Sequence, residues 1–161
     1  QHRGAFPRDI RPLLKDWVFG CDECLAKCPF TRASQETKWP EFRTDPIDRL
    51  DLLALFSIGS NRRHKERFRG TALLRASRKM ILRNAAVVLG NLGDARAVPV
   101  LAKALEKEGP LVRMHAAWAL GRIGTGGARR VLEERLREES NPEVREEIRL
   151  ALSGSASTRP R

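Results

Sequence analysis

Residues 85–93 read Ala-Ala-Val-Val-Leu-Gly-Asn-Leu-Gly, and residues 116–124, 31 positions further on, read Ala-Ala-Trp-Ala-Leu-Gly-Arg-Ile-Gly. In both copies the apolar residues return every three or four positions, which predicts an amphipathic helix. The match continues at the same offset, where Val100-Leu101 and Leu105 recur as Val131-Leu132 and Leu136. A period near thirty residues with two helices per unit predicts an α-solenoid of HEAT-like repeats, in which each helix pair buries its apolar face against its neighbours.

Short signals predict where these helices begin and end. Gly93 is expected to stop the first helix, and Asp94 to cap the next by accepting from free backbone N–H groups. Pro99 lies near the start of that helix, where a missing N–H costs least. Asn141-Pro142 begins a third unit with a capping Asn and a proline at the first helical position. We therefore expect repeats over residues 80–152 and a flexible tail over 153–161.

The three cysteines lie in one short loop, Cys21-x2-Cys24-x3-Cys28-Pro29. An odd number of clustered thiols cannot form a disulfide framework, so the loop indicates a reducing compartment and a metal. In two-cluster ferredoxins a cysteine followed by proline ligates the second cluster. The spacing therefore favours Cys21 and Cys24 as ligands of one [4Fe–4S] cluster and Cys28 as a ligand of another, completed from outside this chain. A zinc site is the alternative, but it lacks a fourth cysteine, and His115 falls inside a repeat helix, where a packed or solvated histidine is expected instead of a ligand.

Positive charge is concentrated in the middle of the chain. The 161 residues carry a net charge of +11, and most of it lies in residues 60–83, where Glu66 is the one acidic residue. This density predicts a phosphate-binding patch for a polyanionic partner, although a solvated helical face remains an alternative. If residues 71–83 form one helix, four of its basic residues share a face. The basic residues of the segment are Arg62, Arg63, Lys65, Arg67, Arg69, Arg75, Arg78, Lys79 and Arg83.

The rest of the chain is less regular. Residues 48–56 resemble a helix, whereas residues 30–46 contain breaking prolines and are expected to form a loop with at most a short helix. We expect a domain boundary near residue 46, with residues 1–46 belonging to the cysteine segment and 47–152 to a helical domain. No apolar run is long enough to cross a membrane. The chain begins with Gln1, so its natural start is expected to lie further upstream.

Two stretches together carry a family resemblance. Residues 3–13, followed by Asp16-Trp17-Val18-Phe19-Gly20-Cys21-Asp22-x-Cys24-x3-Cys28-Pro29, are similar to the second ferredoxin motif of epoxyqueuosine reductases. Residues 81–91, Ile-Leu-Arg-Asn-Ala-Ala-Val-Val-Leu-Gly-Asn, resemble the entry of that family into its HEAT-like repeats. The motifs also follow the order of the family. The implied fold is all-α, a partial ferredoxin-like iron–sulfur segment followed by a solenoid.

The resemblance implies the C-terminal part of a cobalamin-dependent iron–sulfur oxidoreductase that reduces epoxyqueuosine to queuosine at the wobble position of a tRNA anticodon. It implies two [4Fe–4S] clusters with Cys21, Cys24 and Cys28 as ligands, and a cobalamin that receives their electrons. The first ferredoxin motif and the cobalamin-binding half with its catalytic acid are absent, so no catalytic residue is assigned and the chain alone should be inactive. We expect a cytoplasmic monomer that binds a tRNA anticodon stem-loop and an external electron donor.

Two other functions fit part of the pattern. An electron-transfer module fused to a protein-binding HEAT scaffold would share the cysteine loop but would have no affinity for RNA. A basic HEAT scaffold whose cysteines hold zinc would share the repeats and the charge. Three aromatic residues near the loop are expected to shield a cluster from solvent rather than to stack on bases; they are Phe30, Trp39 and Phe42.

Overall fold

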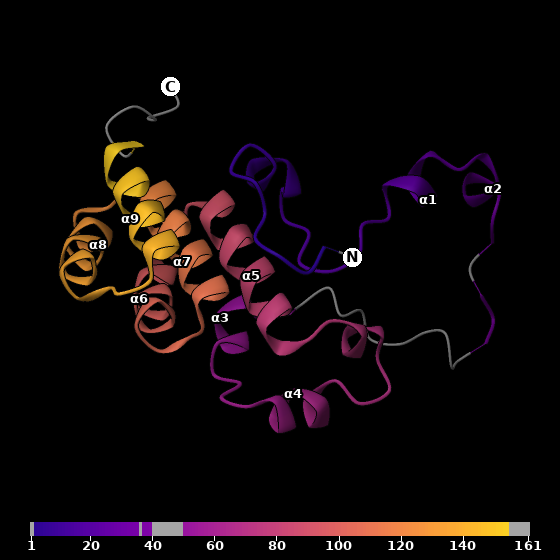
Figure 1. Ribbon diagram of the computed structural model, residues 1–161. Helices are drawn as coiled ribbons and strands as arrows, with labels where there is room; N and C mark the ends of the chain where they lie inside the picture. The colour runs from indigo at the N-terminus through magenta and orange to yellow at the C-terminus, as the bar shows by residue number, and fades with distance from the viewer. Residues whose placement is uncertain (1, 36, 40–49, 155–161) are drawn as a thin grey trace.

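The computed structural model of the protein describes residues 2–35, 37–39 and 50–154 (Figure 1). Within these ranges the chain forms helices, turns and loops and contains no strand. The all-α prediction is confirmed for this part of the chain, whereas a ferredoxin-like fold for the cysteine segment stays a prediction. The longer helices are α5 (Arg78–Leu92), α6 (Val98–Lys107), α7 (Pro110–Ile123), α8 (Gly126–Glu138) and α9 (Pro142–Gly154).

These five helices form the predicted solenoid. Helices α5, α7 and α9 lie side by side in an inner layer, and α6 and α8 form an outer layer against them (Figure 1). The repeated alanine pairs, at residues 85–86 and 116–117, are completely buried in the inner layer. Their small side chains let neighbouring helices come close, which is why the repeat keeps them on this face.

The closest approach between inner helices occurs at a repeated glycine. A Cβ atom on Gly90 would lie 2.8 Å from the Cα of Ala119, and one on Gly121 would lie 2.7 Å from the Cβ of Ala151. No real side chain tolerates such distances without movement of the backbone. Because the two glycines are 31 positions apart, the same contact is made twice, once between α5 and α7 and once between α7 and α9.

The predicted helix end at Gly93 and the predicted cap at Asn141 are confirmed, whereas Asp94 does not cap α6 as expected. Gly93 and Gly124 end α5 and α7 in the left-handed conformation, with φ of 67° and 66°. The carboxylate of Asp94 accepts a hydrogen bond from the backbone N–H of Arg96 at 2.9 Å and so caps the 3₁₀ helix η5 (Ala95–Ala97). The residue that precedes α6, Ala97, makes no side-chain capping bond. The side chain of Asn141 accepts one from the N–H of Val144 at 3.1 Å.

Two predicted helices in the first half are shorter than expected. Of the helix expected over 48–56, the described residues 50–56 form only α3 (Leu52–Leu55), because the Asp51 carboxylate caps it by accepting from the N–H groups of Leu53 and Ala54. Residues 48 and 49 lie outside the described residues. The single helix over 71–83 is also wrong: η4 (Ala72–Arg75), a 3₁₀ helix, is separated from α5 by extended backbone at Ala76 and Ser77. Around them lie η1 (Arg11–Leu14), α1 (Glu23–Lys27), α2 (Pro29–Arg32), α4 (Asn61–Arg67) and η5 (Ala95–Ala97).

The N-terminal segment packs against the inner layer of the solenoid. The side-chain amide of Asn84 donates to the carbonyl of Val18 at 2.7 Å, and that of Asn91 donates to the carbonyl of Lys15 at 2.8 Å. The backbone N–H of Phe6 donates to Nε2 of His115 at 3.1 Å. Residues 2–18 thus share a core with the repeats, while the boundary expected near residue 46 lies outside the described residues. The first two residues of the tail expected over 153–161, Ser153 and Gly154, are instead the last residues of α9. Residues 155–161 lie outside the described residues.

Candidate functional site

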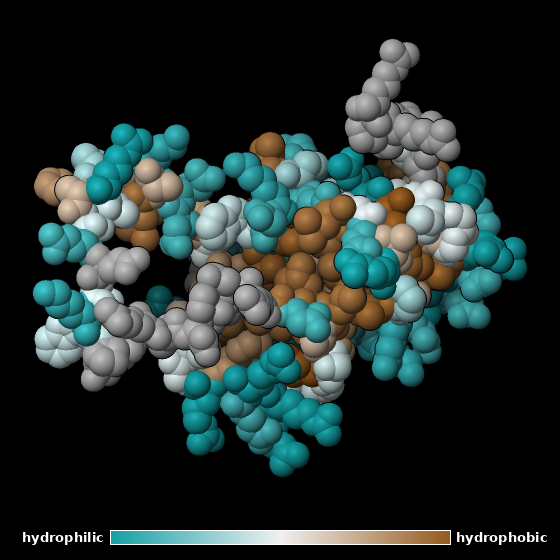
Figure 2. Space-filling model, turned by 180° about the vertical axis from the view of Figure 1, so that it is seen from behind, coloured by the Kyte–Doolittle hydropathy of each residue, from teal (hydrophilic) through white to brown (hydrophobic). Residues whose placement is uncertain are grey.

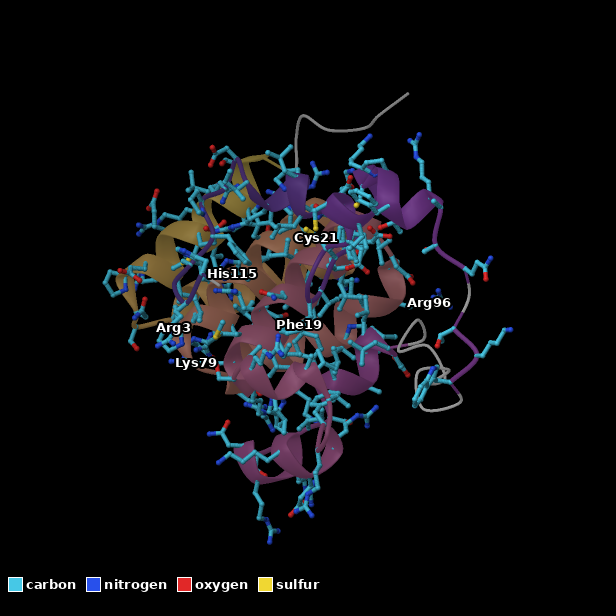
Figure 3. The ribbon with its side chains drawn as sticks, turned by 90° about the vertical axis from the view of Figure 1, so that its right-hand side faces the viewer. Arg3, Phe19, Cys21, Lys79, Arg96 and His115 are labelled. Atoms are coloured by element: carbon cyan, nitrogen blue, oxygen red, sulfur yellow. The ribbon has the colours of Figure 1, made fainter. Side chains whose placement is uncertain are left out.

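The cysteine loop extends away from the helical body (Figure 1). Cys21 precedes α1, Cys24 lies within it, and Cys28 separates it from α2. None of the three is in a disulfide; Cys21 and Cys24 are exposed and Cys28 is half-buried. In Figure 3, which faces the side on which the loop projects, Cys21 lies in front of the repeat helices. The thiols are therefore open to a ligand or to another protein surface.

Cys28 sits in a backbone turn that favours its ionised form. Hydrogen bonds from the backbone and side chain of Thr31, and then from the backbone of Phe30, lower the pKa of the Cys28 thiol. Pro29 starts α2, so the backbone N–H groups of Phe30 and Thr31 belong to the first turn of that helix. Since the thiolate and not the thiol binds metals, this local structure suits a ligand.

The described side chains do not form a complete metal centre. In the part of the chain that the structure describes, no three His, Cys, Asp or Glu side chains gather into a group able to hold a metal. A structural zinc site needs four ligands converging on one point. The ligation of iron–sulfur clusters by these three cysteines therefore stays a prediction.

The basic residues of α4 form an exposed surface. Ser60 caps the helix by accepting from the N–H of Arg63, and the buried side chains of His64 and Phe68 anchor it. Hydrophilic side chains project from the lower end of the molecule, where α4 lies (Figure 2). The ion pair between Arg62 and Glu66, at 3.8 Å, is exposed and weak. The exposed basic residues here are Arg62, Arg63, Lys65, Arg67 and Arg69.

Arg78 has a structural position instead of a free one. Its guanidinium donates to the Glu108 carboxylate, with Nη1 at 2.8 Å from Oε2, and also contacts the carbonyl of Ile58. Its side chain is 14% exposed. A two-pronged Arg–carboxylate pair of this kind ties the start of α5 to the end of α6. Arg78 is thus placed at a helix junction.

Arg83 is buried although it belongs to the basic stretch. Its guanidinium lies 3.9 Å from the centre of the Phe6 ring and donates to the carbonyls of His2 and Gly4. Burial lowers the pKa of Arg83 to about 10, so it remains charged at neutral pH. Its hydrogen-bond partners all come from the N-terminal segment or from Asn84, and it is not on the basic surface.

Arg3 is a further basic residue of this surface, and the sequence pattern did not indicate it. Arg3 lies beside Lys79 (Figure 3), and both line a hollow of about 570 Å³ together with Lys65 and Arg75. Nothing in the local sequence around Arg3 relates it to residues more than sixty positions away. The contact exists only when Arg83 holds the N-terminal segment against α5, so no local signal could have revealed it.

The aromatic residues near the cysteine loop do not cover it. Phe30 is 84% exposed and Trp39 is 66% exposed. Phe42 lies outside the described residues. The expected shielding of a cluster is therefore not made by Phe30 or Trp39 within this chain, and it would need an additional protein surface.

Comparison with known proteins agrees with this fold. A family model for HEAT repeats matches residues 68–153, slightly more than half of the chain. This chain belongs to the HEAT-repeat family. The matched region begins at Phe68, ahead of α5, and ends near the end of α9, so it includes every helix pair of the solenoid.

The same comparison confirms the resemblance to epoxyqueuosine reductases. This HEAT-repeat chain is 34% identical over 149 residues to the epoxyqueuosine reductase of Bacillus subtilis, covering 92% of the chain and 39% of that protein. It is 38% identical over 128 residues to that of Pseudomonas aeruginosa, covering 77% of the chain and 35% of that protein. A crystal structure of epoxyqueuosine reductase with a tRNA-Tyr epoxyqueuosine-modified stem loop superposes with a TM-score of 0.85 at 31% identity, covering 97% of this chain and 42% of that one.

The chain spans about two fifths of the length of these reductases. The likeness includes the cysteine segment as well as the repeats, because it extends over nearly the whole chain while the HEAT match begins at residue 68. No described helix is long and apolar enough to cross a membrane.

Proposed function

We propose that this chain is the C-terminal part of an epoxyqueuosine reductase, where it binds tRNA and supplies ligands to electron-transferring clusters. The observation that carries the proposal is the TM-score of 0.85 with a reductase bound to a tRNA stem loop, over 97% of this chain. The substrate would be epoxyqueuosine in the anticodon, reduced to queuosine.

Cys21, Cys24 and Cys28 would act as thiolate ligands in this enzyme. Cys21 and Cys24 would hold one [4Fe–4S] cluster and Cys28 a second, with the other ligands and a cobalamin held by residues outside this chain. When bound, the clusters supply one-electron transfer toward the cobalamin. The chain's own contribution is to keep the thiols accessible at the end of a projecting loop and to favour the deprotonated form of Cys28.

The basic surface would position the anticodon stem-loop. Phosphate contacts fix the register and orientation of a nucleic acid without reading its sequence, which suits an enzyme that must place one nucleotide over a cofactor. The exposed basic residues of α4 project from a helix that is anchored by His64 and Phe68. The unpaired thiols fit a reducing compartment, so we also propose a cytoplasmic monomer served by an external electron donor.

A chimeric enzyme tests the proposal. The region of the Bacillus subtilis reductase that matches this chain is replaced by residues 1–161, and the chimera is expressed in cells lacking the reductase. Queuosine in the tRNA, detected by mass spectrometry of nucleosides, is the expected result. A chimera carrying Cys24→Ser should yield epoxyqueuosine instead, while its absorbance near 400 nm is reduced.

Two results would reject it. A stable chimera that binds iron and leaves epoxyqueuosine unreduced would favour an electron-transfer module fused to a protein-binding scaffold. Purified protein that contains zinc and no iron after anaerobic preparation would favour a basic HEAT scaffold. Matched chimeras with Arg96→Gln, a change at an exposed residue outside the cysteine loop, control for general damage.

A further inference from the structure

Four free cations of this chain face the same space, which the paired Arg78 also lines. Lys65 comes from α4, Arg75 and Lys79 flank the junction of η4 and α5, and Arg3 comes from the N-terminal segment. All four side chains are exposed, and none of them forms a hydrogen bond or ion pair with another residue that the structure describes. They differ in this from Arg78 and Arg83, whose guanidinium groups are occupied.

The space between them is a hollow of about 570 Å³, here called the basic hollow. Its floor includes the buried side chains of Ala76 and Met80, and none of the described residues that line it is acidic. Ser77 also lines it, and the hydroxyl of Ser77 does not cap α5. The hollow therefore offers several positive charges and a hydroxyl with no competing carboxylate.

Buried hydrogen bonds beneath the basic hollow hold the backbone segments that carry these cations. Arg83 binds the carbonyls of His2 and Gly4, on both sides of Arg3, and so fixes the backbone that carries it. Nε2 of the buried His64 lies 3.0 Å from the carbonyl oxygen of Ala76, which joins α4 to the η4–α5 junction. Sites held in place by buried hydrogen bonds lose less entropy on binding. Arg83 is thus a positioning residue for the basic hollow.

We infer that the basic hollow binds a phosphate of the RNA backbone, with Arg3, Arg75 and Lys79 as its principal contacts. The inference rests on the proposed function and assigns its tRNA contacts to particular residues. A polyanion is favoured over a small free anion because the exposed basic residues of α4 continue from the rim of the hollow, next to Lys65. Successive phosphates of one strand can therefore meet positive charge on both surfaces.

The test measures binding of an anticodon stem-loop RNA to the 161-residue chain by fluorescence anisotropy over a range of salt concentrations. A variant with Arg3→Gln, Arg75→Gln and Lys79→Gln should bind about tenfold or more weakly. Its slope of log affinity against log salt should fall by roughly 0.7 to 0.9 for each phosphate that is no longer bound. The control removes the same charge elsewhere, by Arg96→Gln, Arg130→Gln and Arg137→Gln at exposed positions, and should change both quantities much less.

A conservative variant and a second ligand sharpen the outcomes. Arg75→Lys in place of Arg75→Gln should restore part of the slope, because the charge at that position returns. If the unaltered chain binds the stem-loop and the hollow variant does so with the same affinity and slope, the inference fails and the proposed function stands. If the unaltered chain binds no RNA, both fail. Loss of binding to phosphatidylserine vesicles alone, with RNA binding kept, would also overturn the inference.

Discussion

At the scale of single residues, burial changes what a charged or titratable side chain does. Arg78, Arg83 and Arg75 carry the same guanidinium group. That of Arg78 is bound by a carboxylate, and that of Arg83 lies on an aromatic ring and donates to two carbonyls, whereas that of Arg75 is exposed. His115 shows the same effect. It is completely buried, its Nδ1 lies 2.8 Å from the carbonyl of Leu111, and its Nε2 accepts from Phe6. Both nitrogens are satisfied only in the neutral ring.

His115 should make the fold sensitive to mild acid. Burial lowers the pKa of His115 to about 3, so between that pH and about 6.5 the unfolded chain takes up a proton that the folded chain does not. The stability is complete above pH 6.5 and decreases as the pH falls. Between pH 6.5 and 5 we expect a loss of about 2 kcal/mol, at roughly 1.4 kcal/mol per pH unit, measured by urea unfolding.

The variant His115→Gln checks the origin of this slope. It should be less stable than the parent at pH 7.5, since glutamine cannot reproduce both ring contacts. Its stability should change little between pH 6.5 and 5. An unchanged slope in the variant would assign the acid sensitivity to other groups.

At the scale of elements, the distance between neighbouring helices of the inner layer depends on the size of the side chains at their contact. The repeated glycines remove a Cβ where α5 meets α7 and where α7 meets α9. The helix ends are tied by repeated ion pairs as well: Glu108 after α6 holds Arg78, and the buried Glu139 after α8 holds Arg113 at 2.8 Å. Each pair thus joins the start of an inner helix to the end of the following outer one.

Gly90→Ala should destabilise the solenoid despite alanine's higher helix propensity. The new methyl group would overlap the backbone of Ala119, and overpacking typically costs about 1–3 kcal/mol, against a gain of about 1 kcal/mol from propensity. Gly127→Ala in α8, where the nearest atom would lie 4.0 Å from the new methyl group, should be neutral or slightly stabilising. Thermal unfolding followed by circular dichroism compares the two; equal melting temperatures would refute the close approach.

Arg83→Met should release the N-terminal segment. The variant keeps the length of the side chain but loses the bonds to His2 and Gly4, so the segment should open more often and trypsin should cleave after Arg8 and Lys15 several times faster. Arg75→Met, at an exposed position, serves as the control. Equal cleavage of both variants would mean that Arg83 does not hold the segment.

At the scale of the whole molecule, the cysteine loop contributes little to the stability of the solenoid, although the two are parts of one chain. The loop contributes no buried side chain to the core between Gly20 and Lys27, whereas residues 2–18 pack on the repeats. Ligand binding at the loop and folding of the repeats should therefore be independent.

Cys24→Ser tests that independence. The substitution affects an exposed side chain outside the core, so the helical signal at 222 nm and its melting temperature should remain within about 2 °C of the parent. Reconstitution with iron and sulfide, in the chimera described above, should be impaired at the same time. A large drop in melting temperature would show that the loop and the repeats fold as one unit.

Local patterns predicted much of this structure correctly. The repeat, the helix end at Gly93 and the cap at Asn141 depend on residues within a turn or two of each other, or on a period that the sequence displays directly. The cysteine loop was found by spacing for the same reason. The sequence left open whether His115 is packed or solvated, and it did not predict the short 3₁₀ helix that Asp94 caps. Asp51 and the extended Ala76-Ser77 junction shortened two predicted helices because capping and local backbone geometry compete with periodicity.

The sequence alone determined that the chain is a HEAT solenoid with a cysteine loop and an excess of positive charge beside it. Only the tertiary structure decided which positive charges are free. Arg83 is enclosed by a segment nearly eighty positions earlier, and that same docking brings Arg3 to Lys79. An amphipathic period is visible in residues that are close in sequence, whereas the solvation of a charged group depends on atoms that come from distant segments.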